Sequence, residues 1–205
     1  MKRIYTKSSD LIRVSHLTRF RMALTLARAF RDDPYSAHFF RANLLGIAAR
    51  FLVFADEISS RRASGVILSE AGAVALVGLP PTPFLSLRDI GFATRLALDI
   101  QGSAYRAKWS TIWRDLSASQ PANVVYLSAL ACPKRERRRG HGSRLLARAR
   151  SLADDLGLPL TFDVSTLQLV DWYRRRGFSV VGTHAFVGGP TIYHMSTTDG
   201  PTGRH

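Results

Sequence analysis

The chain has 205 residues, 46% of them hydrophobic and 21% charged, a size and composition that fit one globular domain and exclude a disordered chain. Its formal net charge of +14 comes mainly from arginine, which reflects either arginine-rich codon usage or an attraction to polyanions such as nucleic acid or a phosphate-bearing ligand. The single cysteine, Cys132, excludes an internal disulfide framework, and no apolar run approaches the ~20 residues of a membrane span. We therefore expect a cytoplasmic domain over residues 1–197, followed by a flexible tail over residues 198–205.

The first half of the chain combines helical periodicity with one pair of short apolar runs. In chain order it predicts a strand, two helices, two hairpin strands and two more helices, over residues 10–14, 15–30, 35–55, 63–70, 73–79, 86–100 and 103–118. Ser15 is a candidate N-cap of the first helix, and Pro34 ends that helix because proline cannot continue it. The dipeptide Ala71-Gly72 between the two apolar runs predicts the turn of a β-hairpin.

The second half has the pattern of a βαβ unit followed by two strands. Its elements are predicted as strand, helix, strand, short helix, strand and strand, over residues 123–132, 142–157, 158–165, 166–177, 178–184 and 191–196. Leu145, Leu146 and Ala149 mark the apolar face of the first helix, and Gly157 closes it. A helical first half with a hairpin, joined to such a unit, predicts a mixed α/β domain.

The stretch Arg135–Arg144 joins the best strand of the sequence to the helix that follows. Gly140 and Gly142 immediately precede that helix, whose first N–H groups have no partner within it, so the turn predicts an anion site that suits a pyrophosphate. Two familiar phosphate motifs are excluded. A P-loop needs a lysine where this chain has Ser143, and the dinucleotide fingerprint needs a third glycine where it has Leu145.

The remaining pattern, R-x-x-G-x-G over residues 137–142, resembles the pyrophosphate-binding motif of the GNAT acyltransferase superfamily, which binds acetyl-CoA. As in that family, the motif follows a long strand that ends in "YLSALACP" and opens an amphipathic helix. A further strand and a short helix ending in Y-x-x-x-G-F, over residues 173–178, then follow in the family's order. Together these matches cover residues 123–182.

The first half carries a looser resemblance. Its stretches "LARAFRDDP" and "LVGLPPTP" look similar to the puromycin-acetyltransferase-like branch of the superfamily. Two features depart from the family pattern. The loop between Pro133 and Gly140 is one residue longer than usual, and Leu169 stands where many relatives have an asparagine that helps to hold the cofactor arm.

The resemblance implies a mixed, mostly antiparallel sheet with helices on both faces, acetyl-CoA as the acyl donor and, as in many relatives, a homodimer. The strand end is implied to pair its backbone with the pantetheine arm through Leu130, Ala131 and Cys132. The turn and the helix start are implied to bind the pyrophosphate, through Arg137, Arg138, Arg139, Gly140, His141, Gly142 and Ser143.

Direct transfer of an acetyl group from a thioester to an amine requires two proton transfers. An alkylamine of pKa about 10 must lose a proton before it attacks, and the departing thiolate gains one. Tyr173 matches the family's general acid; the alternative is a tyrosine that packs in the core beside Trp172. Asp163, on the strand after the motif helix, is the favoured base. Glu70 is its rival, and a water chain without a dedicated base remains open.

Other reactive side chains have simpler interpretations. Cys132 is a candidate nucleophile, but direct transfer needs none, so we expect a small buried strand residue. His184 and His194 lack a third ligand at metal-binding spacing, so no metal site is predicted. Trp109 and Trp113, four residues apart on a predicted helix, are core residues or a wall of the acceptor pocket.

The sequence therefore favours an N-acetyltransferase that uses acetyl-CoA and acts on a small-molecule amine by direct attack. The net charge keeps open the acetylation of a macromolecular amine, on a protein or an aminoacyl-tRNA. It also keeps open a non-catalytic nucleic-acid-binding module that uses Arg135–Arg144 and Arg174–Arg176. A domain that binds acetyl-CoA without catalysis is a further alternative, and no membrane partner is expected.

Overall fold

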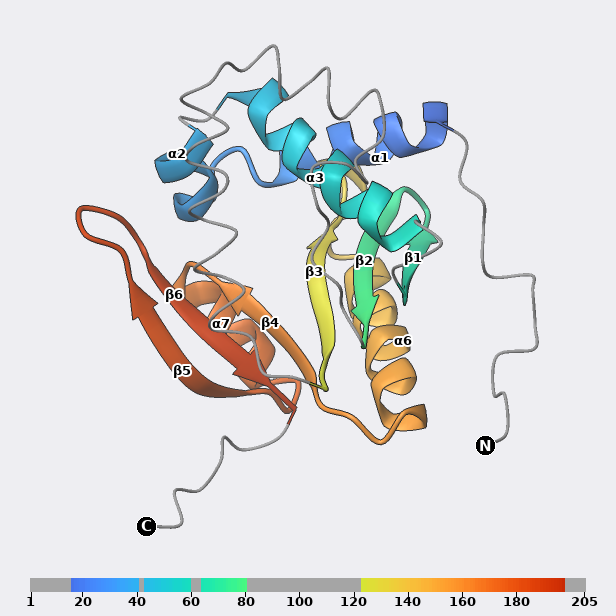
Figure 1. The fold of residues 1–205 in the computed structure, drawn as a ribbon, viewed down its shortest axis with the longest axis vertical. Helices are drawn as coiled ribbons and strands as arrows, with labels where there is room; N and C mark the ends of the chain where they lie inside the picture. Colours follow the sequence, from blue (N-terminus) through green and yellow to red (C-terminus); the bar gives the residue numbers. More distant parts are fainter. Residues whose placement is uncertain (1–15, 41–42, 60–63, 81–122, 198–205) are drawn as a thin grey trace.

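The computed structural model describes residues 16–40, 43–59, 64–80 and 123–197, which form one six-stranded sheet with helices around it (Figure 1). The strand order is β1-β2-β3-β4-β6-β5. All neighbours pair antiparallel except β3 and β4, which run parallel. The strands β1 to β6 span Ser64–Glu70, Ala73–Leu79, Val125–Ala131, Leu160–Val164, Ser179–Ala185 and Thr191–Ser196. This confirms the prediction of a mixed, mostly antiparallel sheet.

Helices cover both faces of the sheet, as predicted. They are α1 (His16–Ala29), α2 (Pro34–Phe40), α3 (Leu44–Ser59), α6 (His141–Asp155) and α7 (Leu167–Arg174), with a 3-10 turn, η1, at Lys134–Glu136. On the α1–α3 face, Leu26 and Phe51 share a core with Leu76 of β2. On the α6–α7 face, Leu145 shares a core with Val77 of the same strand. Because both of its faces are covered, β2 is buried along its whole length.

The single helix predicted over residues 35–55 is wrong, because α2 and α3 are separate helices. Each has its own N-terminal cap. The Asp33 carboxylate accepts a hydrogen bond from the Ser36 N–H at 2.9 Å, with Pro34 at the first helical position of α2. The Asn43 side-chain oxygen accepts one from the Leu45 N–H at 3.0 Å and so caps α3. Helical periodicity continues across the break, so only these capping residues mark it.

The other predicted elements within the described residues are confirmed to within a few residues at each end. The hairpin turn has positive φ at both central residues, 49° at Ala71 and 79° at Gly72, as a two-residue turn of this hand requires. Gly157, with φ of 65°, follows the end of α6. The strand, helices and tail predicted from sequence outside these ranges, with Ser15, Trp109 and Trp113, lie outside the described residues. Within the described residues, no helix is long and apolar enough to cross a membrane.

Strands β3 and β4 pair only at their first residues and then separate. Val125 is partnered by Leu160 and Tyr126 by Thr161, and the ladder ends there. Figure 1 shows the two strands meeting at one end and spreading toward the other. On the opposite edge of β3, Ser128 forms a bulge between the residues that pair with β2. The facing edges of β3 and β4 beyond Tyr126 therefore carry backbone groups that are not used by the sheet.

Candidate active site

The start of α6 presents N–H groups that have no acceptor in the described part of the chain. The first bond of the helix runs from the Arg144 N–H to the Gly140 carbonyl at 3.0 Å. The N–H groups of residues 141–143 therefore find no acceptor among the described residues. Gly140, the N-cap, has φ of 82°, and Arg138 has φ of 64°. Residues with left-handed backbone conformation in such a turn form concavities that bind anions. The sequence predicts an anion site at this turn.

The two glycines of this turn have different surroundings. A Cβ added to Gly140 would lie 3.0 Å from Nη1 of Arg144, and the positive φ at Gly140 would be strained for any other residue. A Cβ added to Gly142 would have no neighbour within 4 Å. Gly140 is therefore needed for the turn itself, whereas Gly142 leaves open space beside the unpaired N–H groups.

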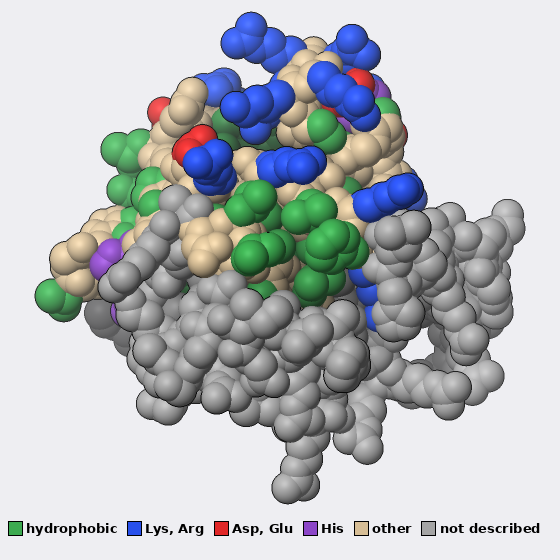
Figure 2. Space-filling view, turned by 90° about the horizontal axis from the view of Figure 1, so that it is seen from above, with side chains coloured by type: hydrophobic (Ala, Val, Ile, Leu, Met, Phe, Trp, Pro, Cys, Tyr) green, Lys and Arg blue, Asp and Glu red, His purple; other side chains and the backbone are tan. Residues whose placement is uncertain are grey.

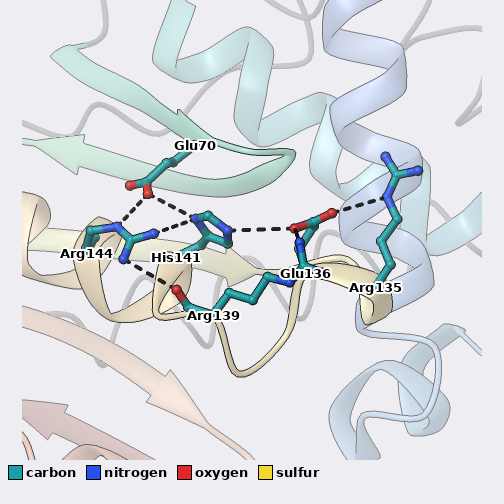
Figure 3. Close-up of polar contacts among 6 residues, drawn as sticks. All are labelled: Glu70, Arg135, Glu136, Arg139, His141 and Arg144. Atoms are coloured by element: carbon teal, nitrogen blue, oxygen red, sulfur yellow. Dashed lines mark hydrogen bonds and ion pairs between the residues drawn. The ribbon is translucent and has the colours of Figure 1, made fainter.

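Glu70, the rival candidate base, lies at this turn and is already bound by two side chains (Figure 3). Its Oε1 accepts a hydrogen bond from Nε of Arg144 at 2.5 Å and lies 3.0 Å from Nδ1 of His141. The hydrogen bonds to His141 and then Arg144 lower the pKa of Glu70. A carboxylate held in its charged form in this way is a poor proton acceptor, so the contacts favour a structural role for Glu70.

Glu136 extends the same network along the turn. Its Oε2 accepts a hydrogen bond from Nη1 of Arg139 at 3.1 Å and lies 3.7 Å from Nε2 of His141. Its Oε1 lies 3.7 Å from Nε of Arg135 (Figure 3). Arg138 is exposed and makes no hydrogen bond or ion pair with the described residues. That guanidinium is thus available to a ligand.

The turn stays strongly positive despite these two carboxylates. Residues 134–144 include six Lys and Arg side chains and one acidic side chain. Figure 2 shows Lys and Arg side chains spread over the described part of one face, with acidic side chains in only a few places. The turn is also tied to α7, because Nη2 of Arg176 donates to the Ser143 hydroxyl at 3.5 Å while its guanidinium stacks over Trp172.

The end of β3, which is predicted to contact the pantetheine arm, lies where β3 no longer pairs with β4. Ala131 is buried, whereas Leu130 and Cys132 are half-buried on the α6–α7 face. The carbonyl of Cys132 accepts a hydrogen bond from Nε of Arg137 at 3.3 Å. Burial raises the pKa of the Cys132 thiol, which lowers its thiolate fraction and argues against a nucleophile. The expected buried strand residue is not what is found, because Cys132 lies just past the end of β3 and is half-buried.

Tyr173 lies on the α6–α7 face of the sheet, close to the separation of β3 and β4. Its ring packs 4.3 Å from Phe162 and 4.7 Å from Trp172, measured between ring centroids. Burial raises the pKa of Tyr173, so its hydroxyl keeps its proton at physiological pH. The hydroxyl makes no hydrogen bond within the described residues. The residue therefore combines core packing beside Trp172 with a hydroxyl proton that no described residue accepts.

Asp163 lies on the other face of the sheet, because it directly follows Phe162 and successive strand side chains point in opposite directions. Its Oδ2 accepts a hydrogen bond from the Tyr126 hydroxyl at 2.8 Å. Its Oδ1 lies 2.6 Å from Nδ1 of His194, its direct cross-strand partner on β6. The bond to Asp163 raises the pKa of His194. Burial, and then the Asp163 charge, raise the pKa of Tyr126 well above its usual value.

Sequence reasoning missed Tyr126 and His194 as members of this cluster, which we call the strand triad (Tyr126, Asp163 and His194). The three residues come from β3, β4 and β6, and only the register of the strands brings them together. His184 does not join His194; it is exposed on β5 with its ring against Phe186. Among the described residues no group of three metal-ligating side chains is found.

Comparison with known proteins gives matches at the level of structure. No family model and no curated protein matches the chain. It is similar to a structure described as histone acetyltransferase HPA2 and related acetyltransferase from Corynebacterium glutamicum, with 16% identity, a TM-score of 0.60, and coverage of 92% of this chain and 96% of that one. It is also similar to arylalkylamine N-acetyltransferase 2 from Aedes aegypti, with 13% identity, a TM-score of 0.54, and coverage of 89% and 95%.

A further structure, from Agrobacterium tumefaciens, is 26% identical over 35% of this chain, which spans about half (54%) of that protein, with a TM-score of 0.32. This partial match adds nothing to the assignment of the fold. The two long matches, with the sheet topology, show that the chain has the fold of the GNAT acetyltransferases. The finer resemblance to the puromycin-acetyltransferase-like branch remains a prediction.

Proposed function

We propose that the protein is an N-acetyltransferase that transfers the acetyl group of acetyl-CoA directly to the amine of a small molecule. One observation carries the proposal: the open, positively charged start of α6 lies at the end of β3, the strand whose edge separates from β4. A pyrophosphate suits the first feature, because unpaired N–H groups and the helix dipole favour anions. An extended arm with amide groups suits the second, because it can pair with an unused strand edge.

The donor would be held by two neighbouring sets of residues. The pyrophosphate would lie against the N–H groups of residues 140–143, with Arg137, Arg138, Arg139 and His141 around it. The pantetheine arm would run along Leu130–Cys132. This route brings the thioester toward the last pair of β3 and β4, between the two faces of the sheet.

Tyr173 and Asp163 would serve the two proton transfers from opposite faces. Tyr173 would protonate the departing thiolate, and its neutral, uncommitted hydroxyl supports that role. Asp163 would be the carboxylate on the proton-accepting side, where the amine arrives. Placing the two groups on either side of the strand gap separates the entry of the acceptor from the departure of the thiolate.

The acceptor is proposed to be a small amine. The Aedes aegypti neighbour is named for arylalkylamines, and Asp163 and His194 remain partly accessible at 18% and 22% of their side-chain surface. A single domain over residues 1–197, a cytoplasmic location and a homodimer belong to the same proposal. Light scattering at several protein concentrations tests the dimer.

Calorimetry with acetyl-CoA, followed by release of free CoA thiol across a panel of alkylamines, arylalkylamines and polyamines, tests the proposed function. We expect saturable binding and thiol release that depends on at least one amine. Absence of acetyl-CoA binding in the folded protein would overturn the proposal. Binding with no amine-dependent release from any member of the panel would leave a domain that binds the donor without catalysis.

A macromolecular amine is the second candidate acceptor, favoured by the exposed basic side chains around the turn and at the end of α7, including Arg138, Arg174 and Arg175. Binding of RNA or aminoacyl-tRNA would then weaken steeply with salt. Titration of RNA at fixed salt, with and without saturating CoA, separates the readings. RNA displaced by CoA points to a shared site, whereas RNA binding without any CoA binding points to a nucleic-acid module.

A further inference from the structure

We infer that Nε2 of His194 accepts the proton that the acceptor amine must lose, and that Asp163 and Tyr126 position His194. The inference rests on the proposed function, and it names the atom that takes the proton of the amine. Sequence analysis places Asp163 in this role; the contacts around it point to its histidine neighbour as the group that meets the amine.

Both oxygens of Asp163 are already engaged. Oδ2 accepts from Tyr126 at 2.8 Å, and Oδ1 lies 2.6 Å from Nδ1 of His194. The register of β4 and β6 makes Asp163 and His194 direct partners, so the contact is fixed by the backbone. With Nδ1–H donated to the carboxylate, the free lone pair of the neutral imidazole is on Nε2. Nε2 makes no hydrogen bond within the described residues.

The residue next to His194 on β5 is a glycine. Gly182 on β5 is the partner of His194 on the side away from Asp163, and a Cβ added there would lie 3.4 Å from Cδ2 of the imidazole. The imidazole ring therefore extends toward β5. Nε2 is bonded to Cδ2, the ring atom nearest to Gly182. A side chain at position 182 would take up the space that a substrate amine needs to approach Nε2.

An unsatisfied polar group marks the same place in the sheet. Thr161 is two residues before Asp163 on β4, so both side chains point to the α1–α3 face. Its hydroxyl is buried and has no hydrogen-bond partner among the described residues. Thr161 is also the partner of Tyr126 in the last pair before β3 and β4 separate. Buried hydroxyls are normally paired, so this one indicates a site that a polar ligand or water completes.

The transfer removes two protons from the acceptor nitrogen and adds one to the thiolate sulfur. The ammonium form of the acceptor gives one proton to Nε2 of His194, and its freed lone pair forms the new N–C bond at the acetyl carbon. The C–S bond then breaks, and the thiolate sulfur takes the hydroxyl proton of Tyr173. The nitrogen gives up its second proton, which replaces the proton lost from the Tyr173 oxygen. The imidazolium, held by the Asp163 carboxylate, then releases its proton to solvent, so each turnover yields one amide, one thiol and one proton.

The pH dependence of turnover reports which group accepts the proton. Among the described residues, the titratable groups that face His194 are Asp163 on β4 and, through it, Tyr126 on β3. Arg50 of α3 and Tyr35 of α2 contribute to the field at Tyr126. His194 acts as a base only when neutral, so turnover should rise with pH through its pKa. Because Asp163 raises that pKa, the rise should lie at higher pH than expected for an ordinary histidine, whose pKa is ~6.5.

The decisive experiment compares kcat against pH for the wild type, H194Q and D163N at saturating acetyl-CoA, with an alkylamine found active in the panel. We expect kcat of H194Q to fall by ~10²–10⁴-fold and its rise with pH to disappear. The kcat of D163N should still rise with pH, but the rise should occur at lower pH. The imidazole remains in this variant but loses the carboxylate that raises its pKa. H184Q, on the exposed part of β5, is the matched control and should behave as the wild type.

An arylamine that is unprotonated at neutral pH provides the second readout. H194Q should lose much less activity on that acceptor than on the alkylamine, which a folding defect would not produce. Two results would overturn the inference and leave the proposed function intact. The first is a kcat and pH profile of H194Q equal to those of the wild type. The second is a kcat that no longer rises with pH in D163N but still does so in H194Q. Failure of the wild type to bind acetyl-CoA would overturn the proposed function, and the inference with it.

Discussion

The turn at the start of α6 and the strand triad are both polar, but they are built in opposite ways. The turn gathers its charges from one contiguous stretch, and they lie largely in solvent: the side chains of Arg135 and Arg139 are 85% and 65% exposed. The triad gathers one residue from each of three strands, and Asp163 and His194 are only 18% and 22% exposed. Water and salt screen the first set far more than the second.

This difference predicts different responses to mutation. Around the turn several cations can substitute for one another, so losing a single side chain should matter little, whereas the backbone conformation should matter greatly. In the triad Tyr126 and His194 each bind a different oxygen of Asp163, so the loss of any one group should have a measurable effect.

Replacement of Tyr173 by phenylalanine should have the largest effect, because it removes only the proposed proton donor. Turnover should fall by ~10²–10⁴-fold, the usual contribution of a positioned general acid. Acetyl-CoA affinity should change little, since the ring and its packing on Phe162 remain. The fall should therefore appear in kcat, measured with an active amine under conditions where chemistry limits the rate.

Tyr193→Phe is the matched control for Tyr173→Phe, because Tyr193 packs against the same core and loses the same hydroxyl. It should keep the turnover of the wild type. If Tyr173→Phe stays within about twofold of the parent, Tyr173 is a packing residue and another group protonates the thiolate.

Asp163→Asn should reduce stability more at low pH than at high pH. His194 has a raised pKa in the folded protein, so its bond to Asp163 stabilises the fold fully below the unfolded pKa of histidine, ~6.5, and less as pH rises through the folded value. The loss should be about 1–3 kcal/mol near pH 5.5, the usual contribution of a hydrogen bond to a charged group. Urea unfolding of both proteins at pH 5.5 and above pH 8 measures it, and a loss that grows with pH would contradict the proposed pairing.

Glu70→Gln should have the smallest effect on turnover, because the carboxylate lies near the surface, with 30% of its side chain exposed, and its charge is held by His141 and Arg144. Turnover should change by less than about fivefold, as expected for a solvent-exposed ion pair. Acetyl-CoA affinity should rise slightly, since Arg144 and His141 become available to the pyrophosphate. A fall of 100-fold or more in kcat, with affinity retained, would instead make Glu70 the base.

The contrast between the two regions also explains what the sequence could predict. The turn is contiguous, so Gly140, Gly142 and the helix that follows are visible as a pattern, and the fold of the second half follows from the order of its elements. The partnership of Asp163 with His194 depends on the pairing of β4 with β6, which are separated by α7 and β5. Nothing in the local sequence around His194 specifies that register.

The division of residues 35–55 into α2 and α3 is a second feature that apolar periodicity does not predict. Apolar periodicity is continuous over residues 35–55, so it predicts one helix. Asp33 and Asn43 are the residues that divide it, through hydrogen bonds to the N–H groups of Ser36 and Leu45. Capping is a local signal, and a Pro after Asp33 with an Asn before a new apolar run marks two helix starts. The capping residues therefore mark a helix break that apolar periodicity alone does not.

The most direct test of the account is the affinity of Gly142→Val for acetyl-CoA, measured by calorimetry against the wild type and against Arg148→Ala, an exposed change further along α6. Gly142 has no neighbour within 4 Å of an added Cβ and no strained φ, so the variant should fold. Its side chain would fill the space beside the unpaired N–H groups, and we predict a loss of affinity of at least about tenfold, about 1.4 kcal/mol. Gly142→Val that is folded and binds acetyl-CoA as tightly as the wild type would contradict the proposal that the start of α6 holds the pyrophosphate.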